Sequence, residues 1–243
     1  MLVEGAISVK AAIEGGKREV KEVYLTKEKL KVNRNFSYIV KLCKGKNITH
    51  KVLSKEEIDS MCSSYLHGGI CAEVGNYQIT NSFNISNYEN AFFALLEGIE
   101  DPFNYGYALR SLYAAGCDAV FSPKRNWRDS EAIIVRSSGG ASEFLPFFSY
   151  QSPDEIFNEL KYNEINVICG IRQDAQSFYQ VDFKESFIIC FGGEKRGLSQ
   201  EIMKYCDKRV FIPYQREFRN SLNACSAVSV IAFEINRQRF HGE

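Results

Sequence analysis

The sequence has no apolar run long enough to cross a lipid bilayer. Its longest apolar stretches, such as Phe187 to Phe191 and Val228 to Phe233, are far shorter than the roughly 18 to 20 residues that a membrane-spanning helix needs. Residues 1–10 also lack the basic region and the apolar run of a signal peptide. We therefore expect a soluble, cytoplasmic protein that does not bind membranes.

Signature motifs of several enzyme classes are missing as well. No G-x-G-x-x-G follows the first strand and no phosphate-binding G-x-x-x-x-G-K-[ST] occurs, which argues against dehydrogenases and P-loop enzymes. There is no G-x-S-x-G nucleophile elbow, and the three histidines, His50, His67 and His241, lie away from every candidate catalytic loop. The eight cysteines lack the spacing of a zinc site or a redox pair, so we expect buried thiols and no metal.

What the chain does contain is typical of a globular protein. Its 243 residues are 45% hydrophobic and 25% charged, which excludes a disordered, collagenous or coiled-coil protein. Thirty basic side chains balance thirty acidic ones, but residues 1–85 carry four more basic than acidic groups, and residues 86–243 carry four fewer. A modestly basic amino-terminal part can meet a polyanion, although an excess of this size is common.

A polar stretch rich in asparagine, residues 79–90, is typical of a linker between two domains. Before it, residues 1–78 alternate between helical and strand patterns and predict a small α/β domain. The elements expected there are a helix at 7–13, a strand at 20–25, a helix near 36–43, a strand at 48–53 and a helix opened by Ser54 and Glu57.

Residues 91–243 predict a second α/β domain. Short apolar runs alternate with helical patterns, which favours a mainly parallel sheet covered on both faces. Ligands of such sheets bind beyond the carboxyl ends of the strands, so the loops there are candidate sites. We expect strands at 92–96, 118–121, 166–169, 187–191 and 210–212, and helices at 106–115, 154–162, 200–205 and 222–237.

The first of three candidate loops follows the strand at 92–96. Its Asp101-Pro102 pair favours a turn, and Asn104 can cap the next helix. Arg110 is expected on the second turn of that helix, with its guanidinium near the strand ends. An ordinary capped helix with a surface arginine explains this local pattern equally well.

The second loop, Gly192-Gly193-Glu194-Lys195-Arg196-Gly197, follows the strand at 187–191. Glycines let a backbone approach a ligand closely, and Glu194 places a carboxylate at the strand end. A plain tight turn also uses glycines, but it does not favour a glutamate among them. We therefore interpret this loop as functional.

The third loop begins with Ile212-Pro213-Tyr214 and leads to Ser221-Leu222-Asn223 at the start of the last helix. Ser221 could cap this helix, and Asn223 could satisfy amide groups of its first turn. The small residues among 224–229 would let the helix pack closely against another backbone, or against its own copy in a second subunit.

Together and in this order, the three loops resemble the SpoU (TrmH) family of RNA ribose 2′-O-methyltransferases, in the SPOUT superfamily. The similarity covers residues 91–240, and the amino-terminal part, which ends in His67-Gly68-Gly69-Ile70, resembles the family's RNA-substrate-binding domain. Tyr214 stands where the family commonly has methionine, and Ala224-Cys225 replaces a more usual Val-Ser. The matching positions are Asn104, Gly106 and Arg110 in the first motif, Gly192, Glu194, Gly197 and Ile212-Pro213 in the second, and Ser221-Leu222-Asn223 in the third.

The resemblance implies a SPOUT-type sheet whose carboxyl-terminal part is threaded into a deep trefoil knot, which periodicity alone cannot suggest. It also implies a homodimer in which two subunits complete the active site. The implied cofactor is S-adenosylmethionine, held mostly by main-chain groups. The expected cofactor-binding residues are Gly192, Gly193, Glu194, Gly197, Ile212, Pro213 and Leu222.

Methyl transfer to a ribose 2′-hydroxyl requires alignment of the oxygen with the methyl group and stabilisation of the developing alkoxide. A guanidinium stays protonated and is therefore a poor base. We assign to Arg110 the stabilisation of the alkoxide and the positioning of the neighbouring phosphate. A phosphate oxygen or water then receives the proton. By motif position, Asn104 orients Arg110 or the ribose, Glu194 holds the arginine or the cofactor, and Ser221 with Asn223 fixes the loops.

RNA recognition needs phosphate contacts from local basic groups. The sequence thus predicts methylation of a ribose 2′-hydroxyl in structured RNA, ribosomal rather than transfer RNA. The alternative is a non-catalytic RNA-binding or ribosome-assembly protein that retains the fold. Candidate RNA-binding residues beside the three loops are Lys124, Arg125, Arg128, Lys195, Arg196, Arg216 and Arg219.

Overall fold

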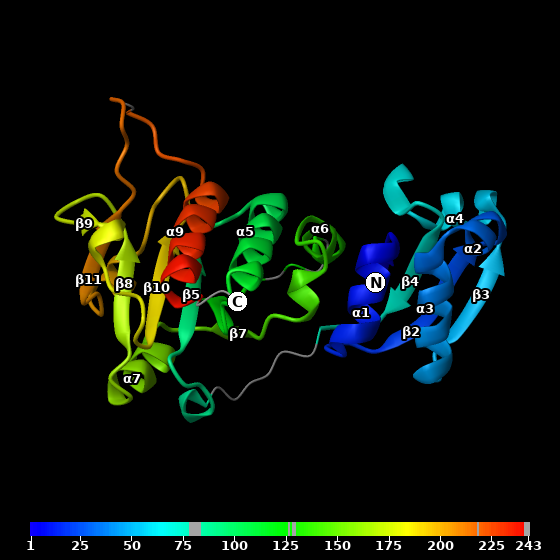
Figure 1. Ribbon diagram of the computed structural model, residues 1–243, viewed down its shortest axis with the longest axis horizontal. Coiled ribbons are helices and arrows are strands. Elements are labelled where there is room, and N and C mark those ends of the chain that lie inside the picture. Colours follow the sequence, from blue (N-terminus) through cyan, green and yellow to red (C-terminus); the bar gives the residue numbers. More distant parts are fainter. Residues whose placement is uncertain (78–83, 126, 128–129, 218, 241–243) are drawn as a thin grey trace. The chain divides into compact units, whose positions relative to one another are not determined.

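The computed structural model describes residues 1–77, 84–125, 127, 130–217 and 219–240 (Figure 1). The chain divides into two compact units. Among the described residues, the first unit comprises 1–77 and 130–144, and the second comprises the others from residue 84 onward. No helix in the described ranges is both long enough and apolar enough to span a membrane.

The first unit is built on a four-stranded sheet in the order β1-β4-β2-β3, in which β2 runs parallel to β3 and antiparallel to β4. Apolar residues of α1, α3 and the strands, such as Ile13, Leu25 and Phe36, form its core. The capping box predicted at Ser54 and Glu57 is confirmed at the start of α4. The elements are β1 (Leu2–Glu4), α1 (Ala6–Gly15), β2 (Val20–Thr26), α2 (Lys27–Val32), α3 (Arg34–Gly45), β3 (Thr49–Leu53), α4 (Lys55–Met61), β4 (Ile70–Val74) and α6 (Glu131–Ser137).

The segment 130–144 packs within the first unit, although the sequence pattern assigns it to the second domain. Arg18, whose side chain is 3% exposed, donates to Glu143 at 2.9 Å and to Glu131 at 3.0 Å. Burial raises the pKa of the Glu143 carboxyl, and the Arg18 guanidinium opposes that shift. Buried charges of this kind are stable only when they are paired. The two ion pairs therefore hold segment 130–144 against residues 1–77 of the same unit.

The second unit contains a seven-stranded sheet in the order β7-β6-β5-β10-β8-β11-β9. Every neighbouring pair in it is parallel, which confirms the predicted fold class; the trefoil knot stays a prediction. The elements are β5 (Phe92–Glu97), α5 (Pro102–Ala114), β6 (Ala119–Pro123), β7 (Phe147–Tyr150), α7 (Asp154–Tyr162), β8 (Asn166–Gly170), β9 (Gln176–Ser177), β10 (Phe187–Gly192), α8 (Gln200–Met203), β11 (Lys208–Phe211) and α9 (Ala224–Arg239).

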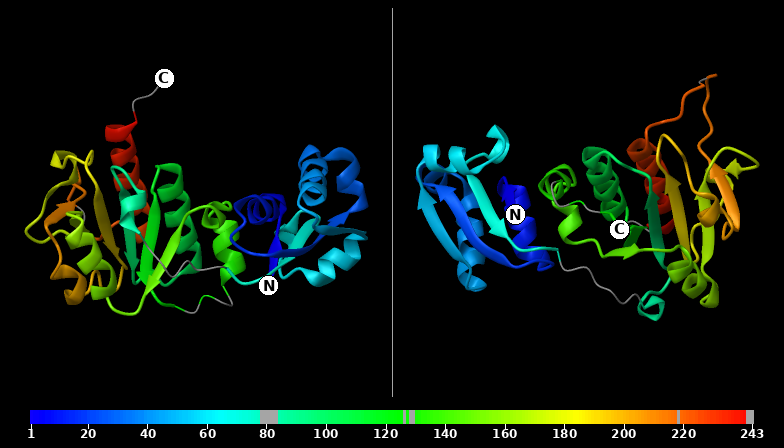
Figure 2. Two further views of the ribbon diagram at one scale, coloured as in Figure 1. Left: turned by 90° about the horizontal axis from the view of Figure 1, so that it is seen from below. Right: turned by 180° about the vertical axis from the view of Figure 1, so that it is seen from behind.

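Helices cover both faces of this sheet. Phe157 of α7 and Ile202 of α8 pack with Phe93 and Leu95 of β5 on one face. Helices α5 and α9 lie side by side on the other face, and the Ser111 and Ser229 hydroxyls form a hydrogen bond between them (Figures 1 and 2). The central strands are therefore buried on both sides, which explains why their sequences are apolar runs without alternation.

The last residue of α9, Arg239, connects segments that are far apart in the sequence. Its guanidinium donates to the backbone carbonyls of Phe183 at 2.6 Å, Asn90 at 2.5 Å and Glu185 at 2.5 Å, and it lies 4.9 Å from the ring centroid of Phe187. The beginning of the second unit is thus fixed to its carboxyl-terminal helix.

Candidate functional site

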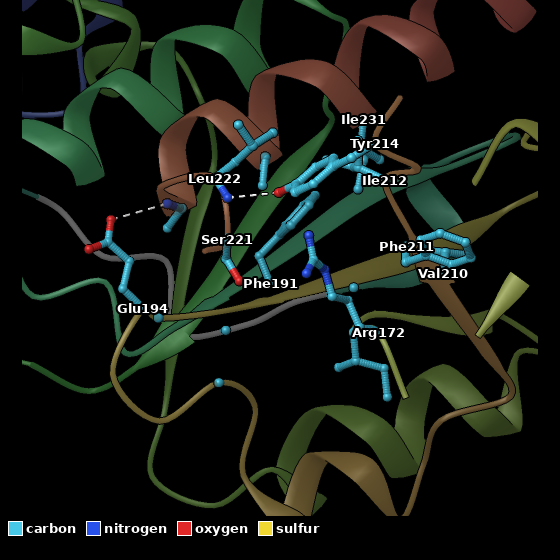
Figure 3. Close-up of a pocket in the computed structure, with 17 residues that line it drawn as sticks. Arg172, Phe191, Glu194, Val210, Phe211, Ile212, Tyr214, Ser221, Leu222 and Ile231 are labelled. Carbon is cyan, nitrogen blue, oxygen red and sulfur yellow. Dashed lines mark hydrogen bonds between the residues drawn. The ribbon is translucent and has the colours of Figure 1, made fainter. Parts of the chain in front are cut away.

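A cavity of about 360 Å³ lies at the carboxyl ends of β8, β10 and β11, beside the first turns of α9 (Figure 3). Because all strands of the sheet are parallel, the loops after them meet at this edge, where such folds bind ligands. The predicted residues that line the cavity are Gly192, Gly193, Glu194, Gly197, Ile212, Ser221 and Leu222.

The first loop leads from β5 into α5. The helix begins at Pro102, four residues earlier than predicted, because Asp101 caps it by accepting a hydrogen bond from the Asn104 amide at 2.8 Å. Proline is favourable at the first position of a helix, so α5 can begin at Pro102. Asn104 is therefore in the first turn of the helix and is not its cap. The Asn104 side-chain oxygen instead lies 3.7 Å from the Cys225 sulfur of α9, whose single thiol proton can go to it or to the Asn223 oxygen at 3.4 Å.

The second loop requires its glycines because backbones approach each other there. A Cβ on Gly193 would lie 2.0 Å from the carbonyl oxygen of Gly98 in the first loop. A Cβ on Gly192 would lie 2.3 Å from the carbonyl carbon of Gly197, which itself has a φ of 64°. Gly193 thus lets the first two loops pack together, and Gly192 lets the second loop close on itself. Both glycines also line the cavity, so the predicted approach of their backbone to a ligand stays a prediction.

Charged side chains of the second loop contact both neighbouring loops. The Glu194 carboxylate accepts a hydrogen bond from the Ala224 amide at 3.3 Å, at the first residue of α9. Lys195 donates to Glu100 of the first loop at 3.0 Å, and this hydrogen bond holds the pKa of the Glu100 carboxyl below its usual range. Because both side chains of the Lys195–Glu100 ion pair are exposed, the pair contributes little to stability.

The third loop is held by two side chains. Asn223 caps α9 by accepting a hydrogen bond from the Ser226 amide at 2.8 Å, as the sequence pattern indicated for its first turn. Ser221 is not the cap; it lies two residues before Asn223 and lines the cavity. The Tyr214 hydroxyl accepts a hydrogen bond from the Leu222 amide at 2.9 Å and so joins both ends of the loop (Figure 3).

Four predicted site residues are not among those that line the cavity. Asn104 and Asn223 organise the adjacent helix starts, and Pro213 is exposed beside the cavity wall. Arg110 lies on the exposed side of α5, in one stripe with Phe103 and Tyr107. The structure therefore brings the second and third loops together, and it places Arg110 on a neighbouring helix surface.

A further part of the cavity wall was not predicted. Gly170 ends β8, Ile171 and Arg172 follow it, and all three line the cavity. The Ile171 amide donates to the Val210 carbonyl at 2.9 Å, which fixes this segment beside β11. The signal that could have indicated it is the position at a strand end, but the order of strands cannot be deduced from one sequence.

The basic residues expected to bind RNA lie around the same edge of the sheet. Lys124, Lys195, Arg196, Arg216 and Arg219 are exposed. Arg125 donates to the carbonyls of Ile99 and Glu100 at 3.2 and 3.1 Å, and so supports the first loop. Arg128 lies outside the described residues.

The chemistry of the lining suits a small organic ligand. The walls are mostly apolar, with Phe191, Ile212, Leu222 and Ile231 among them, and the charged side chains in the lining are those of Arg172 and Glu194. Apolar walls with a few polar groups are typical of cofactor sites. An adenine ring suits such walls, and an amino-acid chain suits charged groups at the rim, so the residues present fit S-adenosylmethionine.

Comparison with known proteins matches both halves of the chain to family models. Residues 91–233 match the SpoU rRNA Methylase family, and residues 2–80 match the RNA 2′-O ribose methyltransferase substrate binding domain. The 23S rRNA (guanosine-2′-O-)-methyltransferase RlmB of Yersinia pestis is 26% identical over 242 residues, which are 98% of this chain and 97% of that protein. A putative TrmH family tRNA/rRNA methyltransferase of Staphylococcus epidermidis is 29% identical over 206 residues, 83% of this chain and 82% of that protein.

Solved structures show the same fold. The SpoU methyltransferase AviRb from Streptomyces viridochromogenes, in complex with AdoMet, superposes with a TM-score of 0.81 at 20% identity, over 100% of this chain and 91% of that one. An rRNA methyltransferase from Sinorhizobium meliloti gives a TM-score of 0.80 at 16% identity, over 98% and 87% of the two chains. With its sequence motifs and the matching family model, the chain belongs to the SpoU rRNA methylase family.

Proposed function

We propose that this protein transfers the methyl group of S-adenosylmethionine to the 2′-hydroxyl of a ribose in ribosomal RNA. The observation that carries the proposal is the convergence of the second and third loops on one cavity at the carboxyl edge of the parallel sheet. Family membership of both halves of the chain supports it, and the relatives named as 23S rRNA methyltransferases favour ribosomal RNA as the substrate.

The residues of the cavity divide the work of binding. Ile212, Leu222 and Ile231 supply apolar surface for the adenine ring, and the backbone of the Gly192–Gly193 turn supplies hydrogen-bonding groups close to the ligand. When bound, S-adenosylmethionine supplies an electrophilic methyl group on a sulfonium. Pro213 directs the chain from β11 into the third loop, and Glu194 keeps that loop beside the second through Ala224.

Arg110 serves the reaction as a fixed positive charge. Its guanidinium stabilises the developing alkoxide of the ribose and positions a neighbouring phosphate, while a phosphate oxygen or water takes the proton. Asn104, in the first turn of the same helix α5, orients the substrate ribose. Ser221 and Asn223 hold the third loop in place.

Arg110 reaches a site when two copies of the chain pack together. On α5 the exposed residues Phe103 and Tyr107 form a stripe with Arg110, and on the adjacent α9 Val230 and Phe233 are exposed, by 38% and 51%. Exposed apolar residues on two adjoining helices are typical of a protein interface. A homodimer through α5 and α9 covers them and brings Arg110 to the partner's cavity.

Two measurements test the proposal. Calorimetry of the purified protein should show micromolar binding of S-adenosylmethionine, and ribose methylation mapped in ribosomal RNA should lose one site in cells without the protein. The Arg110→Ala variant should still bind the cofactor in calorimetry. When it is expressed in cells without the protein, it should not restore the methylated site. Binding of RNA without any binding of the cofactor would instead support a non-catalytic RNA-binding protein.

A further inference from the structure

Arg172 is a charged residue of the cavity to which the proposed reaction assigns no role. It follows β8, lines the cavity and is largely exposed to solvent (Figure 3). The other charged residue of the lining, Glu194, already accepts a hydrogen bond from the Ala224 amide. Within the described ranges, Arg172 forms no ion pair and no hydrogen bond, so its five N–H donors face the cavity or solvent.

The position of the Arg172 guanidinium is nevertheless defined. It lies 4.4 Å from the ring centroid of Tyr214, in a cation–π contact. The Tyr214 ring is fixed in turn, because its hydroxyl accepts a hydrogen bond from the Leu222 amide at 2.9 Å. A chain of contacts thus runs from the segment after β8 to the third loop, and Tyr214 is the residue that replaces the methionine common in the family.

The geometry of this contact leaves the guanidinium ready to bind an anion. A guanidinium held over an aromatic ring by a cation–π contact keeps its N–H groups as donors. Two of these donors match the two oxygens of a carboxylate, which a guanidinium binds through paired hydrogen bonds. Because the contact with Tyr214 already orders the side chain, less conformational entropy is lost when the anion binds.

We propose that Arg172, positioned by Tyr214, binds the α-carboxylate of the methyl donor. The inference rests on the proposed function, because it takes S-adenosylmethionine as the ligand of the cavity. The carboxylate is the donor's anionic group, while its sulfonium and ammonium groups are repelled by a guanidinium. Arg172 therefore selects the orientation in which the amino-acid end lies beside the β8 segment and the sulfonium points away from it.

A phosphate of the RNA substrate is the other anion that Arg172 could meet. The donor carboxylate is favoured because Arg172 lines the same cavity as Ile212 and Leu222, which are expected to hold the adenine ring. The phosphate beside the reacting ribose is already assigned to Arg110 in the proposed function. The two assignments differ in one measurable respect, which is the dependence of cofactor affinity on the carboxylate.

The test compares S-adenosylmethionine with decarboxylated S-adenosylmethionine, which lacks only the carboxylate, by calorimetry without RNA. The wild-type protein should bind the complete donor about 10-fold more tightly, as expected for a charge-assisted hydrogen bond at an exposed site. Arg172→Ala should lose this preference and bind both ligands about equally. Lys208→Ala, which removes an exposed charge at the opposite end of β11, should keep the wild-type ratio.

Two Tyr214 variants separate the stack from the hydroxyl contact. Tyr214→Phe should keep the preference for the carboxylate, and Tyr214→Leu should reduce it, because only the second removes the aromatic face. An unchanged ratio in Arg172→Ala would overturn the proposal, and a simultaneous loss of RNA affinity would assign Arg172 to a phosphate. Failure of the wild-type protein to bind either ligand would overturn the proposed function itself.

Discussion

The carboxylate of Glu194 accepts a hydrogen bond from the backbone amide of Ala224, so the turn after β10 is joined to the first residue of α9. Glu194→Ala removes the acceptor and should weaken binding of S-adenosylmethionine about 5-fold, as expected for one hydrogen bond to a charged group at an exposed position. Glu194→Gln keeps an oxygen acceptor and should lose less. Glu185→Ala, an exposed carboxylate before the start of β10, serves as the control in calorimetry. Equal affinities of Glu194→Ala and Glu185→Ala would contradict this role.

The packing of the first two loops makes a sharper prediction for Gly193. An alanine there would place its Cβ 2.0 Å from the Gly98 carbonyl oxygen, so the loops must separate. Gly193→Ala should lower the free energy of unfolding by about 1–3 kcal/mol, as overpacking usually does, and abolish cofactor binding. Gly45→Ala, where a Cβ meets no atom within 4 Å, should leave binding unchanged. Normal cofactor affinity in Gly193→Ala would show that the contact does not set the shape of the cavity.

The exposed side of α5 and α9 predicts an association of two copies. Phe233→Asp puts a charge into the apolar surface that the proposed dimer buries, so light scattering should show a shift from twice the chain mass toward the monomer. Tyr162→Asp, at the end of α7 on the other face of the sheet and 86% exposed, should not change the mass. Methylation should fall together with dimerisation, because the proposed dimer brings Arg110 to the partner's cavity. A fully active monomer would refute this arrangement.

The buried ion pair of the first unit predicts a local loss of stability. Arg18→Ala leaves Glu143, which is fully buried, without its guanidinium partner, and should cost about 3 kcal/mol. Lys21→Ala breaks an ion pair whose side chains are 50% and 45% exposed, and should cost less than about 0.5 kcal/mol. Hydrogen exchange of the β4 amides reports on this unit alone. Similar exchange rates in the two variants would mean that the buried pair does not hold segment 130–144.

The sequence predicts the central strands well because burial on both faces leaves a clear signal. The apolar runs at 92–96 and 187–191 correspond to β5 and β10, and five of the seven strands of the sheet were expected. The edge strands β7 and β9, of four and two residues, were not expected. The start of α5 was misplaced because Asp101-Pro102 suits a turn and a helix start equally well.

The site was predictable only where a loop carries its own motif. Glycines and a glutamate after a strand mark the second loop, and Ser221-Leu222-Asn223 marks the third. Arg172 lacks such a mark, because its place beside Tyr214 depends on β8 lying between β10 and β11. Similarly, nothing near Glu143 indicates that a distant Arg18 neutralises it. Residues whose role comes from neighbours far along the chain are those that one sequence does not reveal.

The contacts of Arg239 affect how the chain matures during synthesis. This residue donates to the carbonyls of Asn90, Phe183 and Glu185. Asn90 lies just before β5, and Phe183 and Glu185 lie just before β10. A ribosome that has made the first 200 residues has supplied every strand but one, yet it has not supplied the side chain that fixes where β5 begins. The methyltransferase half therefore reaches its final form only after residue 239 has left the exit tunnel.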